Sequence, residues 1–168
     1  MPFLEEVVQQ FDDETQKKGC PITLDGPSLL LGSWDKHRLE QVLVNLITNG
    51  IKYGNGKPIS IKVMDQMKSV IIEVKDQGLG IAQEDLPKVF QKFERLGDRK
   101  KASGLGLGLW IVRKIVEGLN GSIEVSSRLG VGSTFRIELP LGEARQNSSE
   151  VLALNIEKKS QHQEFLLP

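Results

Sequence analysis

A helical pattern followed by two alternating patterns constrains the fold of this chain most strongly. Apolar residues recur at helical spacing over residues 36–53, which predicts an amphipathic helix. Apolar and polar residues then alternate over 59–63 and 70–74, which is typical of strands with one buried face. A second helical pattern follows Gly108, and residues 121–139 predict a strand hairpin with a glycine turn. Shorter runs add two expected strands and one helical piece, at 22–24, 29–31 and 83–93.

The two ends of the chain differ from this central part. Residues 3–18 predict another amphipathic helix, so residues 1–18 are expected to pack as a helix on a domain spanning 19–140. The tail, residues 141–168, is rich in Glu, Gln, Ser and Lys. It is expected to be disordered or to form one peripheral helix around 151–156, because it is too short for a core of its own.

Composition excludes several classes of protein. Lysine plus arginine and aspartate plus glutamate both number 22 in the 168 residues, whereas a general nucleic-acid binder carries a basic excess. Cys20 is the single cysteine, which excludes an intrachain disulfide and fits a reducing compartment. No apolar run approaches the roughly 18 residues of a membrane span, and the N-terminus lacks the pattern of a signal peptide. The composition therefore indicates a soluble, cytoplasmic protein.

Three polar residues, Asn45, Asn49 and Lys52, share one face of the helix expected at 36–53, beside its apolar stripe. Asparagine is a poor residue for the middle of a helix, because its amide competes for backbone hydrogen bonds. Amide oxygens are hard ligands that suit Mg²⁺, and a lysine one turn further on can neutralise a phosphate. An ordinary solvated polar face is the alternative interpretation of these residues taken alone.

An aspartate ends the second alternating run. Asp76 shares the parity of Val74, so its carboxylate is expected on the buried face, where it must find donors or lose its charge. The 6-amino group of adenine is such a donor, whereas guanine carries a carbonyl at that position. Gly78 and Gly80 allow the backbone to approach a flat ring closely. A turn in which Asp76 caps the following segment explains these residues equally well.

Three glycines, Gly104, Gly106 and Gly108, precede the second long helical pattern. Free N–H groups and the positive end of the dipole make a helix start suitable for phosphate. The pattern is neither a P-loop, since G-x-x-x-x-G-K-S/T is absent, nor a dinucleotide fingerprint, since no G-x-G-x-x-G follows a strand. A flexible hinge is the alternative. Residues 94–103 are polar, carry four basic side chains and are expected to form a mobile loop.

The order and spacing of these motifs resemble the N, G1, F, G2 and G-x-T boxes of sensor histidine kinases, which belong to the GHKL ATPase superfamily. The motifs are Asn45-x-x-x-Asn49-x-x-Lys52-Tyr53, Asp76-x-Gly78-x-Gly80, Phe90-x-x-Phe93, Gly104-Leu-Gly-Leu-Gly108 and Gly132-Ser-Thr-Phe135. The resemblance covers residues 3–140. It implies a two-layer α/β sandwich, in which a mixed sheet of about five strands carries helices on one face. ATP is expected between the helices and a lid.

The resemblance also implies roles for the matching residues, with ATP and Mg²⁺ as cofactors. Asn45 and Asn49 are expected to hold the metal, Lys52 to contact a phosphate, Asp76 to bind the adenine amino group, and residues 94–103 to form the lid. The implied catalytic residues are Asn45, Asn49 and Lys52. The implied ATP-binding residues are Asn45, Asn49, Lys52, Tyr53, Asp76, Gly78, Gly80, Ile81, Phe93, Arg95, Arg99, Lys101, Gly104, Leu105, Gly106, Leu107, Gly108 and Thr134.

The implied activity is a protein-histidine kinase that transfers the ATP γ-phosphate in two-component signalling. In this family the phosphoacceptor histidine precedes the catalytic domain, on a dimerising helical hairpin with an acidic neighbour. Neither His37-Arg38 nor His162-Gln163 matches that context, and residues 3–18 match the segment after the hairpin. The implied partners are therefore a hairpin domain absent from this chain and a response regulator. Neither nucleic acid nor a membrane span is expected, although the parent protein can be membrane-anchored.

Two other functions fit parts of the pattern. GHKL hydrolases, such as the gyrase, mismatch-repair and heat-shock chaperone ATPases, resemble this chain around Asp76. They carry a glutamate as general base at the position of Asn45, and an amide cannot take a proton near neutral pH, so Asn45 disfavours hydrolysis. A regulatory module that binds ATP without chemistry is the other alternative.

Overall fold

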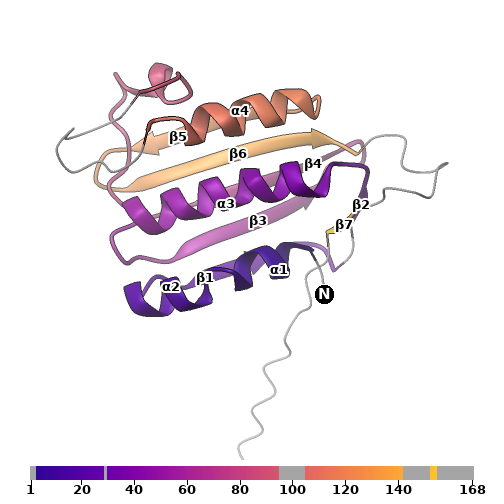
Figure 1. Cartoon of the computed structure of the whole chain (residues 1–168), viewed down its shortest axis with the longest axis horizontal. Coiled ribbons are helices and arrows are strands. Elements are labelled where there is room, and N and C mark those ends of the chain that lie inside the picture. Colours follow the sequence, from indigo (N-terminus) through magenta and orange to yellow (C-terminus); the bar gives the residue numbers. More distant parts are fainter. Residues whose placement is uncertain (1–2, 29, 95–104, 142–151, 155–168) are drawn as a thin grey trace, which may run out of the picture.

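Figure 1 shows a computed structural model of the chain, which describes residues 3–28, 30–94, 105–141 and 152–154. The elements are α1 (Phe3–Gln9), α2 (Asp12–Lys18), β1 (Ile22–Asp25), β2 (Leu30–Gly32), α3 (Lys36–Tyr53), β3 (Ile59–Asp65), β4 (Ser69–Lys75), the 3-10 turn η1 (Leu86–Lys88), α4 (Gly108–Gly118), β5 (Ser122–Arg128), β6 (Gly132–Pro140) and β7 (Leu152–Leu154). Five strands form one sheet in the order β1-β3-β4-β6-β5, with only β1 and β3 parallel to each other. Helices α3 and α4 run side by side across one face, which confirms the predicted two-layer α/β sandwich (Figure 1).

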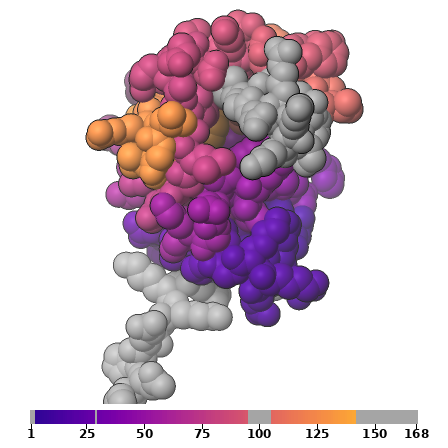
Figure 2. All heavy atoms as spheres, turned by 90° about the vertical axis from the view of Figure 1, so that its left-hand side faces the viewer, coloured from indigo at the N-terminus to yellow at the C-terminus, as the bar shows by residue number. Residues whose placement is uncertain are grey.

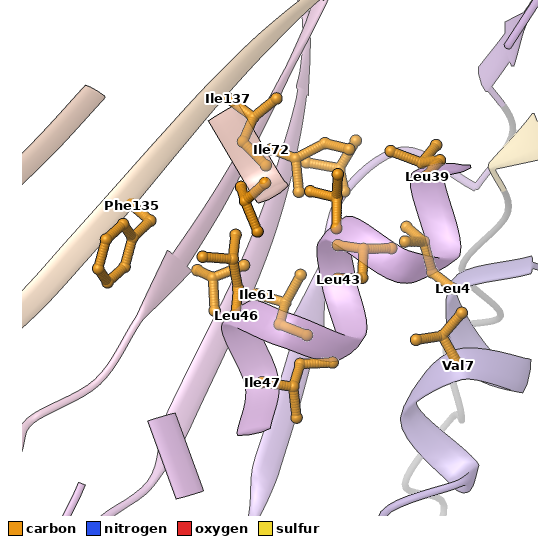
Figure 3. Packing of buried hydrophobic residues seen from close by; sticks show 14 of the residues in the cluster. Leu4, Val7, Leu39, Leu43, Leu46, Ile47, Ile61, Ile72, Phe135 and Ile137 are labelled. Atoms are coloured by element: carbon orange, nitrogen blue, oxygen red, sulfur yellow. The ribbon is translucent and has the colours of Figure 1, made fainter. Parts of the chain in front are cut away.

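The long helix α3 begins and packs as its sequence predicts. Asp35 is the N-cap, and its side chain accepts a hydrogen bond of 3.1 Å from the backbone N–H of Arg38. The apolar stripe of α3 packs onto alternate residues of the sheet, and Leu4 and Val7 of α1 extend this core (Figure 3). The buried residues that meet there are Leu39, Leu43, Leu46, Ile47, Ile61, Ile72 and Ile137.

The opposite face of the sheet carries a row of alternating charges. The strand register places Lys62 opposite Glu73, Glu73 opposite Arg136, and Arg136 opposite Glu124. The guanidinium of Arg136 lies 3.6 Å from the carboxylate of Glu73. Opposite charges on directly facing residues stabilise an antiparallel pair modestly. This row suits a sheet face that faces solvent, so the site has to be sought on the helix side.

Two expectations about the helices were wrong. The helix expected over 3–18 is two helices. The N–H of Phe11 bonds to the carbonyl of Val8, three residues earlier, where an α-helix would use the residue four earlier. Three acidic residues in the next turn then favour a new helix start at Asp12. Residues 83–93 contain only the short turn η1.

Residues Leu152–Leu154 form a strand, β7, where a peripheral helix was an alternative expectation for the tail. They pair antiparallel with β2, which has no partner in the main sheet and whose backbone groups therefore need one. Other parts of the tail, residues 142–151 and 155–168, lie outside the described residues. Within the described ranges no helix is both long and apolar enough to span a bilayer.

A buried tryptophan fixes the segment between β2 and α3. The Trp34 indole N–H donates to the carbonyl of Pro140 at 2.8 Å, and its ring covers Gly32 so closely that a Cβ there would overlap it. We expect Gly32→Ala to lower the free energy of unfolding by about 1–3 kcal/mol, because overpacking forces the ring to move. Urea unfolding of the variant provides the measurement.

Gly118→Ala is the matched control for this substitution. A Cβ at Gly118, in the last turn of α4, meets only the guanidinium of Arg38, at 3.7 Å. Alanine is expected there to be neutral or to raise stability by up to about 1 kcal/mol, because it is the better helix former. A Gly32→Ala chain as stable as the Gly118→Ala chain would contradict the proposed role of the Trp34 ring.

Candidate functional site

The predicted motifs meet at one end of the sheet, which we call the site end. Here the C-terminal ends of α3 and β4, the start of α4 and the turn between β5 and β6 come together (Figure 1). Figure 2 looks onto this end, where the orange β5–β6 turn projects from the surface. Residues separated by more than 50 positions are bonded there, as in the hydrogen bond from Gly130 N–H to the Leu79 carbonyl at 2.7 Å.

Asp76 directly follows the last residue of β4 and is buried, with 8% of its surface exposed. The carboxylate accepts a hydrogen bond of 2.8 Å from the N–H of Gly78, and the Asp76 N–H donates to the carbonyl of Ser133 at 2.9 Å. Burial raises the pKa of Asp76 above its ordinary value, and hydrogen bonds to backbone groups of Gly78 and Ser133 oppose that shift. The sequence parity with Val74 therefore placed this side chain correctly, on the buried side of the sheet.

The loop that follows, residues 76–81, is called the Asp76 loop below. A Cβ at Gly78 would overlap the carbonyl of Tyr53, which instead accepts a hydrogen bond from Leu79 N–H at 3.0 Å. Gly80 has φ +67°, and a Cβ there would overlap the carbonyl of Arg128. These glycines are thus required by contacts within the chain, which press the loop against the end of α3 and the end of β5.

Asn45 and Asn49 lie on successive turns of α3 and are both half-buried. The Asn45 amide nitrogen donates to the carbonyl of Gln41 at 2.8 Å, which fixes the direction of the amide oxygen Oδ1. A Cβ at Gly108 would lie 3.0 Å from that oxygen. The structure therefore places Asn45, on the asparagine face of α3 (Asn45 and Asn49), against the start of α4.

Lys52 and Tyr53 end α3. The Lys52 ammonium lies 4.9 Å from the centre of the Tyr53 ring, and Tyr53 is 37% exposed. Because the Tyr53 carbonyl also holds the Asp76 loop, the end of α3 links the asparagine face to Asp76. The lysine adds positive charge at this end of α3.

The glycine motif frames the start of α4. Gly106 has φ +69°, and its carbonyl accepts a hydrogen bond from Phe93 N–H at 3.0 Å. This bond joins the two sides of the stretch that was expected to be the lid. Phe93 and Leu105 are 64% and 77% exposed, and Gly108 begins the helix after Leu107. The four remaining predicted residues, Arg95, Arg99, Lys101 and Gly104, lie outside the described residues, as do the residues of the expected lid after Glu94.

The strand register separates Thr134 from Asp76. Thr134 pairs with Lys75, so its side chain leaves the sheet on the face away from the helices. Ser133 shares the face of Asp76, is 6% exposed and has its hydroxyl 3.0 Å from that of Ser127. Sequence reasoning missed both serines, although the alternation with Phe135 was a signal for Ser133. Ile81, which was among the predicted ATP-binding residues, donates its N–H to the Ser127 hydroxyl at 2.8 Å.

The donor set suits a hard cation held through amide oxygens. No group of three or more His, Cys, Asp or Glu side chains gathers within the part of the chain that the structure describes. Asn45 instead presents an amide oxygen, fixed in direction by the bond of its nitrogen to Gln41, beside the N-terminus of α4. Neutral oxygen ligands that leave room for water and phosphate are typical of Mg²⁺ sites.

Known proteins are similar to this chain in sequence and in fold. A family profile described as "Histidine kinase-, DNA gyrase B-, and HSP90-like ATPase" matches residues 34–143. The sensor protein SrrB of Staphylococcus aureus is 36% identical over 144 residues, which are 84% of this chain and 25% of that relative. The chain thus spans 25% of the length of the curated relatives it matches.

Solved structures of histidine kinases superpose on the fold. Full-length ShkA in complex with AMPPNP has a TM-score of 0.73 at 27% identity, over 82% of this chain and 29% of that one. The nucleotide-free catalytic domain of ThkA has a TM-score of 0.69 at 27% identity, over 83% and 92%. AdeS of Acinetobacter baumannii has a TM-score of 0.69 at 30% identity, over 83% and 64%. The chain therefore belongs to the family of histidine kinase-, DNA gyrase B- and HSP90-like ATPases, as a catalytic ATP-binding domain of the sensor histidine kinase type.

Proposed function

We propose that this domain binds ATP at the site end and transfers the γ-phosphate to a histidine on a separate phosphoacceptor hairpin. A response regulator would then receive the phosphate. The observation that carries this proposal is the convergence of Asp76, the asparagine face of α3 and the start of α4 on one end of the sheet. The match with kinases that include an AMPPNP complex supports the same function.

Two ends of the nucleotide are recognised by different chemistry. The buried carboxylate of Asp76 offers only acceptors, so it selects the amino group of adenine. The N-terminus of α4 and the Lys52 ammonium supply positive charge for the phosphates. Gly106 and Gly108 keep the backbone of that region open to a phosphate, and Tyr53 lies beside Lys52 on the side of the sugar and phosphates.

Asn45 and Asn49 are the residues that we propose to hold Mg²⁺. The metal, when bound, neutralises charge that develops as the γ-phosphoryl group leaves. The residues of this chain orient the phosphates and place positive potential at the helix start. Because Asn45 is an amide and cannot accept a proton from water, the site lacks the general base that a hydrolase places there.

Asn49→Ala tests the metal assignment. We expect phosphate transfer at saturating ATP to fall by about 100-fold or more, while nucleotide affinity changes less, because the lost charge stabilisation acts on the transition state. The measurement is transfer of labelled phosphate to a supplied phosphoacceptor hairpin, beside calorimetry of nucleotide binding.

Thr48→Ala is the control for this variant, because Thr48 is the exposed neighbour of Asn49 on α3. That variant should keep both transfer and binding. Normal transfer by Asn49→Ala at saturating Mg²⁺ would rule out the metal assignment. Steady-state phosphate release without the hairpin, at a rate matching transfer, would favour a hydrolase instead.

A further inference from the structure

The hydroxyl of Ser127, in β5, joins three segments of the site end. It accepts a hydrogen bond from Ile81 N–H at 2.8 Å, donates to the Gly132 carbonyl at 2.8 Å and lies 3.0 Å from the Ser133 hydroxyl. Ile81 ends the Asp76 loop, whereas Gly132 and Ser133 begin β6. One side chain thus ties the end of the Asp76 loop to the strand that lies beside Asp76.

The direction of each proton follows from the partners. Ser127 has one hydroxyl hydrogen, and the Gly132 carbonyl can only accept, so that hydrogen belongs to the bond with Gly132. The Ser133 hydroxyl must then donate its own hydrogen to Ser127. Ser133 therefore keeps only lone pairs for any other partner, on the same buried face as the carboxylate of Asp76. Both side chains on this face offer acceptors.

The start of β6 also presses directly on Asp76. The Asp76 N–H bonds to the Ser133 carbonyl at 2.9 Å, and a Cβ at Gly132 would overlap the carbonyl of Asp76. A shift of Gly132 or Ser133 is therefore transmitted to Asp76 through backbone contacts. Without the Ser127 hydroxyl, Ile81 N–H and the Gly132 carbonyl would each lose a partner in a part-buried region.

We propose that Ser127 is a positioning residue for base recognition, which fixes Asp76 and turns the Ser133 hydroxyl into an acceptor for an amino group of the base. This inference rests on the proposed binding of ATP adenine at Asp76. It predicts that Ser127 governs affinity for the base and discrimination by its amino group, while leaving the transfer step itself unchanged.

The test uses calorimetry on the full chain with ATP and with purine riboside triphosphate, which lacks the 6-amino group. Ser127→Ala is expected to weaken ATP binding by about 5- to 20-fold. Binding of the purine analogue should weaken much less, because the analogue lacks the amino group that Asp76 and Ser133 are positioned to bind. Transfer to a supplied hairpin at saturating ATP should stay within about twofold of wild type. Ser127→Thr, which keeps the hydroxyl, should restore ATP affinity.

Ser126→Ala is the matched control, because Ser126 is the preceding residue of β5 and is exposed on the opposite face. Ser127→Cys keeps the side-chain size with weaker hydrogen bonds, so an intermediate loss is expected even if the alanine variant does not fold. Wild-type ATP affinity in the alanine or cysteine variant would overturn the proposal. Equal losses for both nucleotides would also overturn it, because they indicate a purely structural role. Failure of the wild-type chain to bind ATP would instead overturn the proposed function on which it rests.

Discussion

Asp76→Asn is expected to weaken ATP binding by about 1–3 kcal/mol, or roughly 5- to 150-fold. Asparagine has the same shape and keeps an oxygen for the Gly78 N–H, which bonds to the Asp76 carboxylate at 2.8 Å. It loses the charge and presents a donor nitrogen where the adenine amino group requires an acceptor. Calorimetry with ATP measures the loss. Asp25→Asn, at the exposed end of β1, is the control and should bind ATP like the wild type.

The Asp76→Asn variant should lose ATP affinity without losing folding stability. Because burial raises the pKa of Asp76 in the folded chain, its contribution to stability is fully present below the unfolded pKa and is lost as pH rises through the folded pKa. At neutral pH the charged carboxylate therefore costs folding free energy that asparagine does not. We expect the variant to be at least as stable as the wild type in urea unfolding. A variant that is unstable at neutral pH would contradict this account.

The same pKa shift predicts a pH dependence of binding. As pH falls through the raised pKa of Asp76, the protonated carboxyl loses the charge that holds the amino group, so ATP affinity of the wild type should fall. Protonation of the ATP phosphates affects wild type and Asp76→Asn alike. The ratio of their dissociation constants isolates the Asp76 contribution, and it should approach one at low pH. A ratio that does not change with pH would argue against a titrating Asp76 at the base.

Local patterns predicted much of the fold. Apolar residues at helical spacing specify α3, and alternating apolar residues specify the strands of the main sheet. The N-cap at Asp35 and the apolar stripe after it gave α3 its bounds, 36–53. The parity of Asp76 with Val74 gave its burial. The same argument applied to Phe135 would have selected Ser133 in place of Thr134, because strand residues alternate faces.

Non-local pairing accounts for what the sequence did not predict. Strand β7 forms because β2, about 120 residues earlier in the chain, offers a backbone partner. Its three residues are too few to show the alternation from which a strand is predicted. The role of Ser127 is hidden for a similar reason, since its partners Ile81 and Gly132 meet only through the sheet register. A serine at an alternating position of a strand has no local signal that distinguishes it from its exposed neighbour Ser126.

The largest effect that we expect is that this chain alone does not label itself with phosphate from ATP. Phosphoryl transfer requires an acceptor in line with the γ-phosphate and at near-attack distance. His37 lies in the first turn of α3, 12 residues before Asn49, which is about 18 Å along the helix axis. Its neighbour Arg38 lies beside Gly118 at the end of α4, whereas the proposed phosphate site is at the start of that helix. His162 lies outside the described residues and has no acidic neighbour in sequence.

Incubation with γ-labelled ATP, followed by detection of acid-labile, base-stable phosphate, distinguishes self-labelling of the chain from transfer to a separate hairpin. The chain alone should remain unlabelled, and an added hairpin domain with an accessible histidine beside an acidic residue should take up label on that histidine. The Asn49→Ala variant should lose most of this transfer, which excludes labelling by a contaminating kinase. Stoichiometric labelling of the chain at His37 or His162 would falsify the assignment of the phosphoacceptor to a separate domain. Because the helix geometry keeps His37 away from Asn49 within one chain, such labelling would require transfer between two copies of the chain or a second site.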